Sequence, residues 1–293
     1  MATYHIKHKT IYSYRYPVAS SHHTACLRPL DKENQKCRRF HLRVSPDSSD
    51  LIQRQDYFSN IVHIFSIQEP HDSLVVNATS LVESTASPQN LKDIDTPVLE
   101  VRKALADIDR TDLIDAKQFL YETEYTAKSK EILDFGNRFF EEDKPIGAGL
   151  FDMLEAFSAD FEFDPEVSDI YTPIQTTLLN KRGVCQDFAH LMIGALRAQG
   201  LAACYASGYI LTQPPPGQER LMGADASHAW VSVFVPEAGW INIDPTNNLV
   251  CGDQHVSVAY GRDFSDVSMI KGAVTGGGEH SIDVQVTMEL VES

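Results

Sequence analysis

The hydrophobic pattern of this chain changes its period near residue 90, and that change limits the folds it can adopt. Before this point apolar and polar residues alternate, as expected for strands with one buried face. The alternating or strand-like runs are residues 4–16, 39–44, 61–67 and 74–82. Turn-forming residues separate these runs. We therefore predict a small antiparallel β-sandwich over residues 1–90.

After residue 90 the pattern becomes helical and then strand-like again. Residues 83–96 lose the alternation and are predicted to be a linker. Apolar residues at helical spacing predict helices within residues 98–108, 132–140, 146–161 and 185–199. Strands are predicted at residues 204–211, 228–235, 240–244 and 282–290. Helices followed by an antiparallel sheet indicate an α+β core, which we assign to residues 91–293.

Charge and composition limit the partners and the compartment of the protein. The formal net charge of −16 disfavours nucleic acids and anionic membranes as partners. No apolar run reaches the roughly 20 residues that span a bilayer, and residues 1–16 lack the apolar centre of a signal peptide. We therefore expect a cytoplasmic protein in which the five cysteines are free thiols. The histidines show no ligand spacing and no CxxC pair occurs, so neither a metal site nor a cofactor is expected.

Cys185 begins one of the predicted helices, and this position favours a reactive thiol. Unpaired backbone N–H groups and the positive end of the helix dipole favour the thiolate over the thiol. The N–H group of Cys185 could also stabilise an oxyanion that develops during acyl transfer. Gly183, two residues earlier, allows the chain to turn tightly into the helix.

A histidine and an aspartate follow at the ends of two predicted strands. His228 begins one strand and Asp244 ends the next, with a turn predicted at residues 236–239. A symmetric four-residue turn would leave the two residues about three positions out of register, so their contact depends on the turn. If they lie side by side, Asp244 would orient the imidazole while His228 takes the proton from Cys185.

Each of these residues has a common structural explanation when it is taken alone. A single cysteine among apolar residues is usually an inert core residue, and an aspartate before proline usually forms a turn. The three residues together, with the cysteine at the start of a helix, favour covalent catalysis.

Four segments of the core resemble the bacterial transglutaminase-like superfamily, which has a papain-like fold, and in particular its members described as candidate cysteine proteases. These segments are residues 182–197, 207–209, 227–233 and 239–247. The resemblance extends to the preceding β-sandwich domain of that group through residues 12–17, 27–29 and 56–60, and to its C-terminal end through residues 261–267 and 276–280. One departure is Ser59-Asn60, where the group commonly has Gly-Asn.

The resemblance implies the same triad as the chemical argument. Its nucleophile corresponds to Cys185, its base to His228 and its orienting acid to Asp244. The N–H group of Cys185 is expected to form half of the oxyanion site. Gln175, upstream of the helix, is our choice for the other half.

We therefore predict acyl transfer from a peptide or protein amide through a thioester on Cys185. Water is the commoner acceptor, so we expect hydrolysis, with cross-linking to a lysine amine as the alternative. A catalytically silent peptide-binding module and a metal-dependent hydrolase are further alternatives. The sequence does not identify the acyl donor, the role of the N-terminal domain or the oligomeric state.

Overall fold

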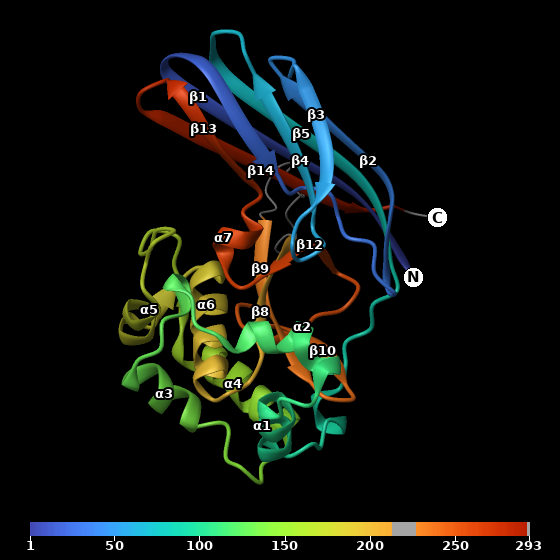
Figure 1. The fold of residues 1–293 in the computed structure, drawn as a ribbon, viewed down its shortest axis with the longest axis vertical. Helices are drawn as coiled ribbons and strands as arrows, with labels where there is room; N and C mark the ends of the chain where they lie inside the picture. Colours follow the sequence, from blue (N-terminus) through green and yellow to red (C-terminus); the bar gives the residue numbers. More distant parts are fainter. Residues whose placement is uncertain (213–226, 292–293) are drawn as a thin grey trace, which may run out of the picture.

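The structure is a computed structural model that describes residues 1–212 and 227–291, and it contains a large antiparallel sheet beside an α+β core (Figure 1). The large sheet consists of β1 (Ala2–Ala25), β2 (Gln35–Ser45), β3 (Asp50–Gln55), β4 (Ile61–Ile67), β5 (His71–Ser84), β13 (Ile270–Gly276) and β14 (His280–Leu290). The core sheet consists of β8 (Ala203–Ile210), β9 (Ser227–Val235), β10 (Gly239–Asp244), β11 (Leu249–Val250) and β12 (His255–Gly261). These sheets and the helices beside them confirm the predicted fold class.

The helices precede the core sheet, except for the last. They are α1 (Val98–Ala106), α2 (Ile114–Lys117), α3 (Lys130–Asn137), α4 (Ile146–Asp160), α5 (Ile174–Asn180), α6 (Cys185–Ala198) and α7 (Phe264–Val267). Short 3-10 turns lie at η1 (Leu91–Asp93), η2 (Thr111–Leu113), η3 (Gln118–Leu120) and η4 (Glu124–Thr126). A small parallel pair joins β6 (Glu162–Phe163) and β7 (Arg182–Gly183).

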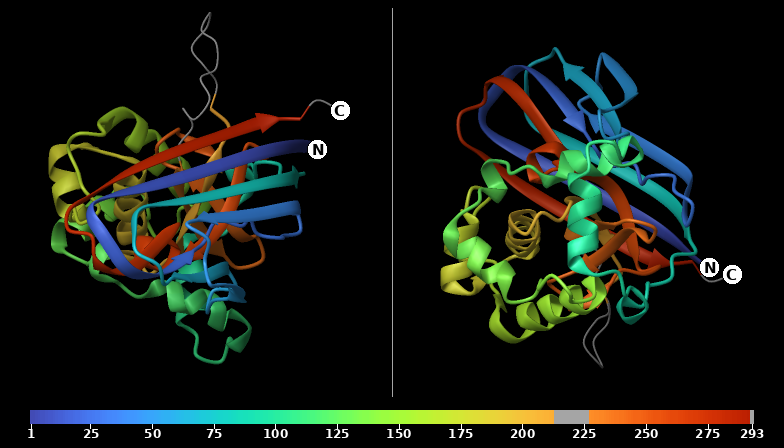
Figure 2. Two further views of the ribbon diagram at one scale, coloured as in Figure 1. Left: turned by 90° about the horizontal axis from the view of Figure 1, so that it is seen from above. Right: turned by 60° about the horizontal axis from the view of Figure 1, so that its bottom comes forward.

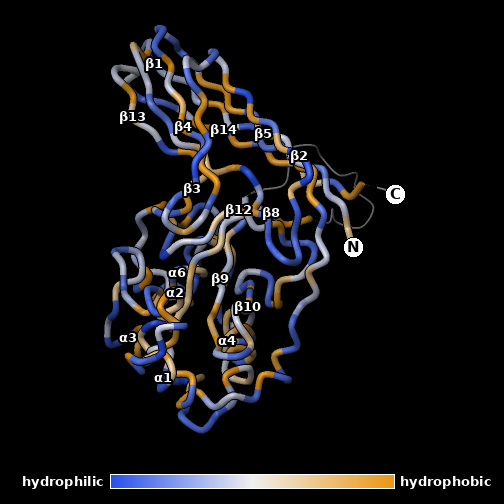
Figure 3. Tube along the Cα trace, turned by 45° about the vertical axis from the view of Figure 1, so that its right-hand side comes forward, coloured by the Kyte–Doolittle hydropathy of each residue, from blue (hydrophilic) through white to orange (hydrophobic). Residues whose placement is uncertain are grey.

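β1 is the longest strand, and its two parts pair with different strands of the large sheet. Its first part pairs with β5 and β14, whereas its last part pairs with β4 and β13. Buried apolar side chains of β1, β2, β4 and β5 pack together in one cluster, which includes Val18, Leu42, Phe65, Leu74 and Val76. The alternation of hydropathy along these strands can be followed in Figure 3. β3 was not predicted because all six of its residues are exposed and therefore show no alternation.

The chain ends in a hairpin that returns to its first strand. Three glycines at positive φ, Gly276 to Gly278, join β13 to β14, and both strands pair with β1. The two termini consequently lie side by side (Figure 2, left). Two strands within the predicted core of residues 91–293 thus belong to the large sheet. The domain boundary at residue 90 remains a prediction.

Helix α6 is the buried centre of the core. It packs against β8 and β9 on one side and against α3 and α5 on the other, and it is seen nearly end-on in Figure 2, right. Every residue from Asp187 to Arg197 is buried. The predicted helix over residues 185–199 is confirmed, and Cys185 lies at its N-terminus.

Two side-chain amides of the N-terminal region fix it to the free edge of β12. Gln35 donates to the carbonyl of Ser257 at 2.9 Å and accepts from its N–H group at 2.8 Å. Asn60 makes the same pair of bonds with Tyr260, both at 2.8 Å. Ser59, which precedes Asn60, has a φ of 66°. Glycine adopts this conformation without strain, which agrees with the Gly-Asn that the family resemblance leads us to expect at this place. These bonds protect the strand edge and hold the two regions together.

Across residues 1–212 and 227–291, no helix is both long enough and apolar enough to cross a bilayer. All five cysteines lie in these ranges, and all are free thiols.

Arg197 is a fully buried guanidinium that joins four segments of the core. It is 1% exposed. It donates to the carbonyl oxygens of Phe119 at 2.9 Å, Ala203 at 2.8 Å and Arg262 at 2.7 Å, and to the hydroxyl of Thr126 at 2.8 Å. Phe119, Thr126 and Ala203 are buried, so a lost hydrogen bond at these acceptors is not readily replaced by water.

We expect the substitution Arg197→Met to lower the free energy of unfolding by about 3 kcal/mol or more, because several buried acceptors lose their donor at once. Urea denaturation followed by circular dichroism measures the change. Arg110→Met is the matched control, since Arg110 is exposed and pairs only with Asp112, and its effect should stay within about 0.5 kcal/mol. Equal denaturation midpoints for the two variants would contradict this account of Arg197.

Candidate active site

Cys185 occupies the first position of α6, where the preceding residues shape the helix N-terminus. Val184 is the extended N-cap residue, and its N–H group donates to Asp187 Oδ2 at 2.8 Å. The hydroxyl of Ser168 donates to the same oxygen at 2.5 Å. A side chain at Gly183 would meet this carboxylate at 2.8 Å, so the position requires glycine. The thiol itself is half-buried and is therefore reachable.

The pairing of β9 with β10 brings His228 and Asp244 onto one face of the sheet. Val235 pairs with Gly239 and Val231 with Ile243, so the connecting turn has three residues, with Glu237 at a φ of 70°. The symmetric four-residue turn that we considered does not form. In the observed register His228 and Asp244 are two positions out of register, and alternate residues of a strand share a face. His228 Nε2 lies 2.7 Å from Asp244 Oδ2.

Asp244 is a fully buried carboxylate that several donors surround. Oδ2 accepts from His228, from Asn247 Nδ2 at 2.7 Å and from His255 Nε2 at 3.2 Å. Oδ1 accepts from the N–H groups of Thr246 at 3.0 Å and Asn247 at 3.3 Å. Burial would raise the pKa of Asp244, but the hydrogen bonds from the two imidazoles, together with the charge of His228, lower it below its usual range. The group is therefore an anion at neutral pH.

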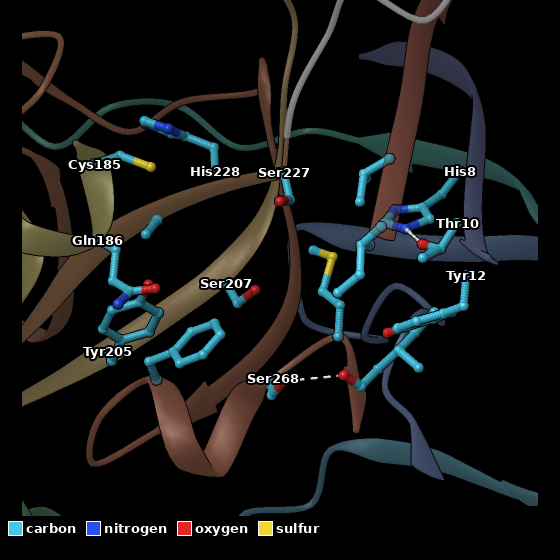
Figure 4. A pocket seen from close by; sticks show the side chains of 16 residues that line it. His8, Thr10, Tyr12, Cys185, Gln186, Tyr205, Ser207, Ser227, His228 and Ser268 are labelled. Carbon is cyan, nitrogen blue, oxygen red and sulfur yellow. Dashed lines mark hydrogen bonds between the residues drawn. The ribbon is translucent and has the colours of Figure 1, made fainter. Parts of the chain in front are cut away.

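His228 connects this anion to the thiol. Its imidazole faces the sulfur of Cys185 (Figure 4), and because Nε2 is bound to Asp244, the other ring nitrogen is left for the thiol. Burial would lower the pKa of His228, but hydrogen bonds to Asp244 and Cys185, and the charges of both, raise it to about 10. An imidazolium at neutral pH stabilises a neighbouring thiolate. The geometry thus places a protonated His228 between the thiol of Cys185 and the buried carboxylate of Asp244.

The sequence analysis did not identify His255, which is a second imidazole on the same carboxylate. His255 begins β12, and its side chain is 4% exposed. Its ring lies edge-on to Trp230, with 5.3 Å between the ring centroids. No motif marks this position, because His255 reaches Asp244 only when β12 folds beside β8. Asn247 was missed for a related reason: its side chain bonds to the triad across a turn.

His228, Asp244 and His255 are also the residues in the described ranges that could hold a metal ion. Their ligand atoms lie within 4.8 Å of one another, and two imidazoles with one carboxylate form a ligand set that zinc uses. The same atoms are already hydrogen-bonded, because both imidazoles bind Oδ2 of Asp244. We expected no metal site because the histidines lack ligand spacing along the sequence, but such spacing cannot reveal a cluster that forms only in the fold. The absence of a metal remains a prediction.

Gln175 lies on α5, and its Nε2 donates to the carbonyl of Ala127 at 3.3 Å. It is not among the described residues that line the cleft at Cys185, whereas Gln186 and Tyr205 are. The assignment of Gln175 as the second oxyanion donor stays a prediction.

We expect His255→Leu to slow the alkylation of Cys185 by iodoacetamide about tenfold at neutral pH. The substitution removes the hydrogen bond that helps to fix the Asp244 carboxylate, so the carboxylate orients His228 less well. The pH at which the alkylation rate rises should also shift, which a purely structural role of His255 would not cause. Peptide mass spectrometry measures the rate at Cys185. The exposed His41 offers the control His41→Leu, and identical profiles for both variants would contradict a positioning role.

Two family profiles and several relatives match this chain. Residues 4–83 match the sequence profile of the bacterial transglutaminase-like N-terminal region, and residues 138–245 match that of the transglutaminase-like superfamily. A Mycobacterium tuberculosis protein is 32% identical over 292 residues, which cover 98% of this chain and 92% of the relative. A Mycobacterium leprae protein is 30% identical over 284 residues, or 96% of each chain.

Two further proteins have descriptions that refer to chemistry. A protein-glutamine gamma-glutamyltransferase of Pseudomonas aeruginosa is 37% identical over 67 residues, which are 22% of this chain and 10% of the transferase. The crystal structure of a candidate cysteine protease from Cytophaga hutchinsonii superimposes with a TM-score of 0.79 at 18% identity. It covers 100% of this chain and 91% of the protease. That similarity supports the fold.

Proposed function

Because this chain belongs to the transglutaminase-like superfamily, with a bacterial transglutaminase-like N-terminal region before the core, we propose that it hydrolyses amide bonds through a thioester on Cys185. The observation that carries this proposal is the position of His228. It lies between the buried Asp244 anion and a thiol at a helix N-terminus, with its pKa raised to about 10. Pure binding has no chemical need for this arrangement.

The proposed reaction begins with attack of the Cys185 thiolate on the carbonyl carbon of a peptide or protein amide. A carbon–sulfur bond forms while the carbonyl electron pair moves to oxygen, and the N–H group of Cys185 is placed to stabilise that oxyanion. The electron pair then returns and the carbon–nitrogen bond breaks. His228 gives its proton to the leaving amine, which leaves a thioester and a neutral imidazole.

The second half of the reaction returns the enzyme to its resting form. His228 removes a proton from water, the hydroxide adds to the thioester, and the Cys185 thiolate leaves as the carboxylic acid is released. Asp244 keeps the imidazole in place and stabilises its protonated form in both halves. Water is the proposed acceptor because it is the commoner acyl acceptor. If the products of a peptide substrate contained only isopeptide bonds to lysine, the cross-linking alternative would replace hydrolysis.

We further propose that the protein is cytoplasmic and acts on peptides or proteins. We expect neither nucleic acids nor membranes to be its partners. The net charge of −16 supports the absence of anionic partners. Cell fractionation with an antibody against the chain tests the compartment, and recovery in an extracytoplasmic fraction would overturn that part of the proposal.

The first test is the pH dependence of Cys185 alkylation by iodoacetamide in the wild type and in His228→Ala. An isolated thiol with a pKa of about 8.5 is only roughly 0.3% thiolate at pH 6. In the wild type the imidazolium persists until the pH approaches about 10, so the thiolate should already react at pH 6. We expect the wild type to react about 30-fold faster than His228→Ala at that pH, after allowance for the lower nucleophilicity of a stabilised thiolate. The two rates should converge as the pH rises toward 10.

His41→Ala is the control, since this histidine is exposed on β2, and its profile should match that of the wild type. If Cys185 reacts no faster than the other four cysteines, and His228 makes no difference, the protein is better described as a peptide-binding module.

A further inference from the structure

The cleft beside Cys185 is walled by both regions of the protein. Its volume is about 220 Å³, and Figure 4 shows Cys185 and His228 on one side with residues of β1 on the other. The wall opposite the thiol belongs to the N-terminal sheet. It consists of His8, Thr10 and Tyr12 from β1 and of Ile282 and Val284 from β14. The catalytic core alone therefore would not form this cleft.

The wall from the N-terminal sheet is continuous because its residues are cross-strand partners. Tyr12 lies directly across from Ile282, and Thr10 directly across from Val284. Residues that alternate along a strand share one face, so these four side chains lie on the face that borders the cleft. The hydrogen bonds of Gln35 and Asn60 to β12 hold this sheet against the core.

The described residues that line the cleft include no aspartate, glutamate, lysine or arginine. This is notable in a chain in which 23% of the residues are charged. His8 does not add a charge at neutral pH, because burial lowers its pKa to about 4. Its ring is held by the hydroxyls of Thr10 at 2.9 Å and Tyr209 at 3.1 Å. Outside the Cys185–His228 pair, a charged group that entered the cleft would find no partner among these side chains.

Two branched apolar side chains on the wall remain open to solvent. Ile282 is 53% exposed and Val284 is 46% exposed. Apolar surface beside a catalytic thiol is a characteristic of a ligand-binding site, where a ligand removes it from water. Hydroxyl groups of Tyr12, Ser207 and Ser227 also line the cleft and supply neutral hydrogen-bonding partners for an amide.

We propose that the N-terminal sheet forms part of the substrate site and selects acyl donors with an uncharged, apolar group beside the amide carbonyl. This inference rests on the proposed function, since it concerns the substrate of Cys185. An apolar group would cover Ile282 and Val284, at about 25 cal/mol for each Å² removed from water. A charged group would lose its hydration in the cleft without gaining an opposite charge. The volume of the cleft suits a single side chain rather than a folded segment.

Alkylating reagents that differ in charge and polarity beside the reactive carbon test this selection without a known substrate. N-isobutyl iodoacetamide is apolar, N-(2-aminoethyl) iodoacetamide is cationic and iodoacetate is anionic. The rate of each at Cys185, read by peptide mass spectrometry, is divided by its rate with N-acetylcysteine. We expect the wild type to favour the isobutyl reagent over the aminoethyl reagent at least about tenfold, which corresponds to roughly 1.4 kcal/mol. The net charge of −16 acts in the opposite direction, so it cannot produce this preference.

The variant Val284→Lys should reverse the selection, and Val274→Lys is its matched control. Val274 lies on β13, is 41% exposed and is not among the described lining residues, so both variants have the same net charge. Relative to the control, Val284→Lys should lose most of the isobutyl preference and should react about tenfold faster with iodoacetate. Ile282→Lys should change the rates in the same direction. A faster reaction with one reagent cannot result from misfolding, and equal urea midpoints for the variants verify the fold.

The outcomes separate this inference from the proposed function. If His228-dependent alkylation by iodoacetamide is fast, but Val284→Lys and Val274→Lys show the same preferences, the N-terminal sheet does not select the acyl donor and only this inference is wrong. If Cys185 reacts no faster than the other cysteines in the wild type, the proposed function itself fails.

Discussion

Replacing Cys185 with serine is expected to reduce amide hydrolysis by a factor of about 10⁴ or more, because the covalent step needs the thiolate. In the wild type the thiol of Cys185 lies beside the His228 imidazolium, whose pKa is raised to about 10. A serine hydroxyl is far less acidic than a thiol, so the same imidazolium does not activate it. Single-turnover assays with an amide selected from a neutral peptide library measure the loss.

The matched control for this prediction is Cys37→Ser. Cys37 is a half-buried thiol on β2 and lies outside the described lining of the cleft. Its variant should retain the wild-type rate, and circular dichroism should show that both variants are folded. If Cys185→Ser matched the wild type in every acyl-transfer assay, thioester chemistry would be excluded and a binding module would become the better description.

Asp244→Asn is expected to lower the same rate by about 10³- to 10⁴-fold. The amide keeps the size of the carboxylate but removes the anion that His228 and His255 share. The pKa of His228 should therefore fall, because the hydrogen bond and the charge of Asp244 both raise it. The imidazole is then neutral at physiological pH and the thiolate loses its partner. Alkylation of Cys185 measured across pH should approach the profile of an ordinary thiol.

The same substitution should also change how stability depends on pH. Because the pKa of His228 is higher in the folded state, protonation of its imidazole stabilises the fold. This contribution is complete below pH 6.5, the ordinary pKa of histidine, and is lost as the pH rises through about 10. The lowered pKa of Asp244 stabilises the fold above its ordinary value of 3.8, and this contribution is lost as the pH falls below that value. Urea denaturation of Asp244→Asn should show a flatter pH dependence in both ranges. The exposed Asp47 offers the control Asp47→Asn, and the same curve for both variants would show that the triad ion pair does not contribute as described.

Elements with one buried face could be predicted from the sequence, whereas elements without that contrast could not. The alternation along β1 and β5 and the apolar spacing in α4 each record which side faces the core. β3 shows no such contrast because it is exposed along its whole length. The final strand was predicted as an element, but its pairing with β1 was not, because alternation indicates a buried face and not the partner strand.

The members of the candidate triad could be selected from local features, since each stands at a helix or strand boundary. The remaining parts of the site come from segments far apart in the sequence. His255 approaches Asp244 from β12, and Tyr12 and Val284 approach the cleft from the first and last strands of the chain. The amide of Gln175 donates to the carbonyl of Ala127, and its role as an oxyanion donor stays a prediction.

The sequence by itself determined the fold class. It also determined that Cys185, His228 and Asp244 lie at the ends of a helix and two strands, because these features depend on neighbours along the chain. Only the tertiary structure decided that His228 and Asp244 meet. A turn longer by one residue would have put them on opposite faces of the hairpin, and the three-residue turn with Glu237 at positive φ puts them on one face. The tertiary structure also decided that the N-terminal sheet closes the cleft. Side chains of β1, β8 and β14 meet there through long-range packing, for which no local pattern exists.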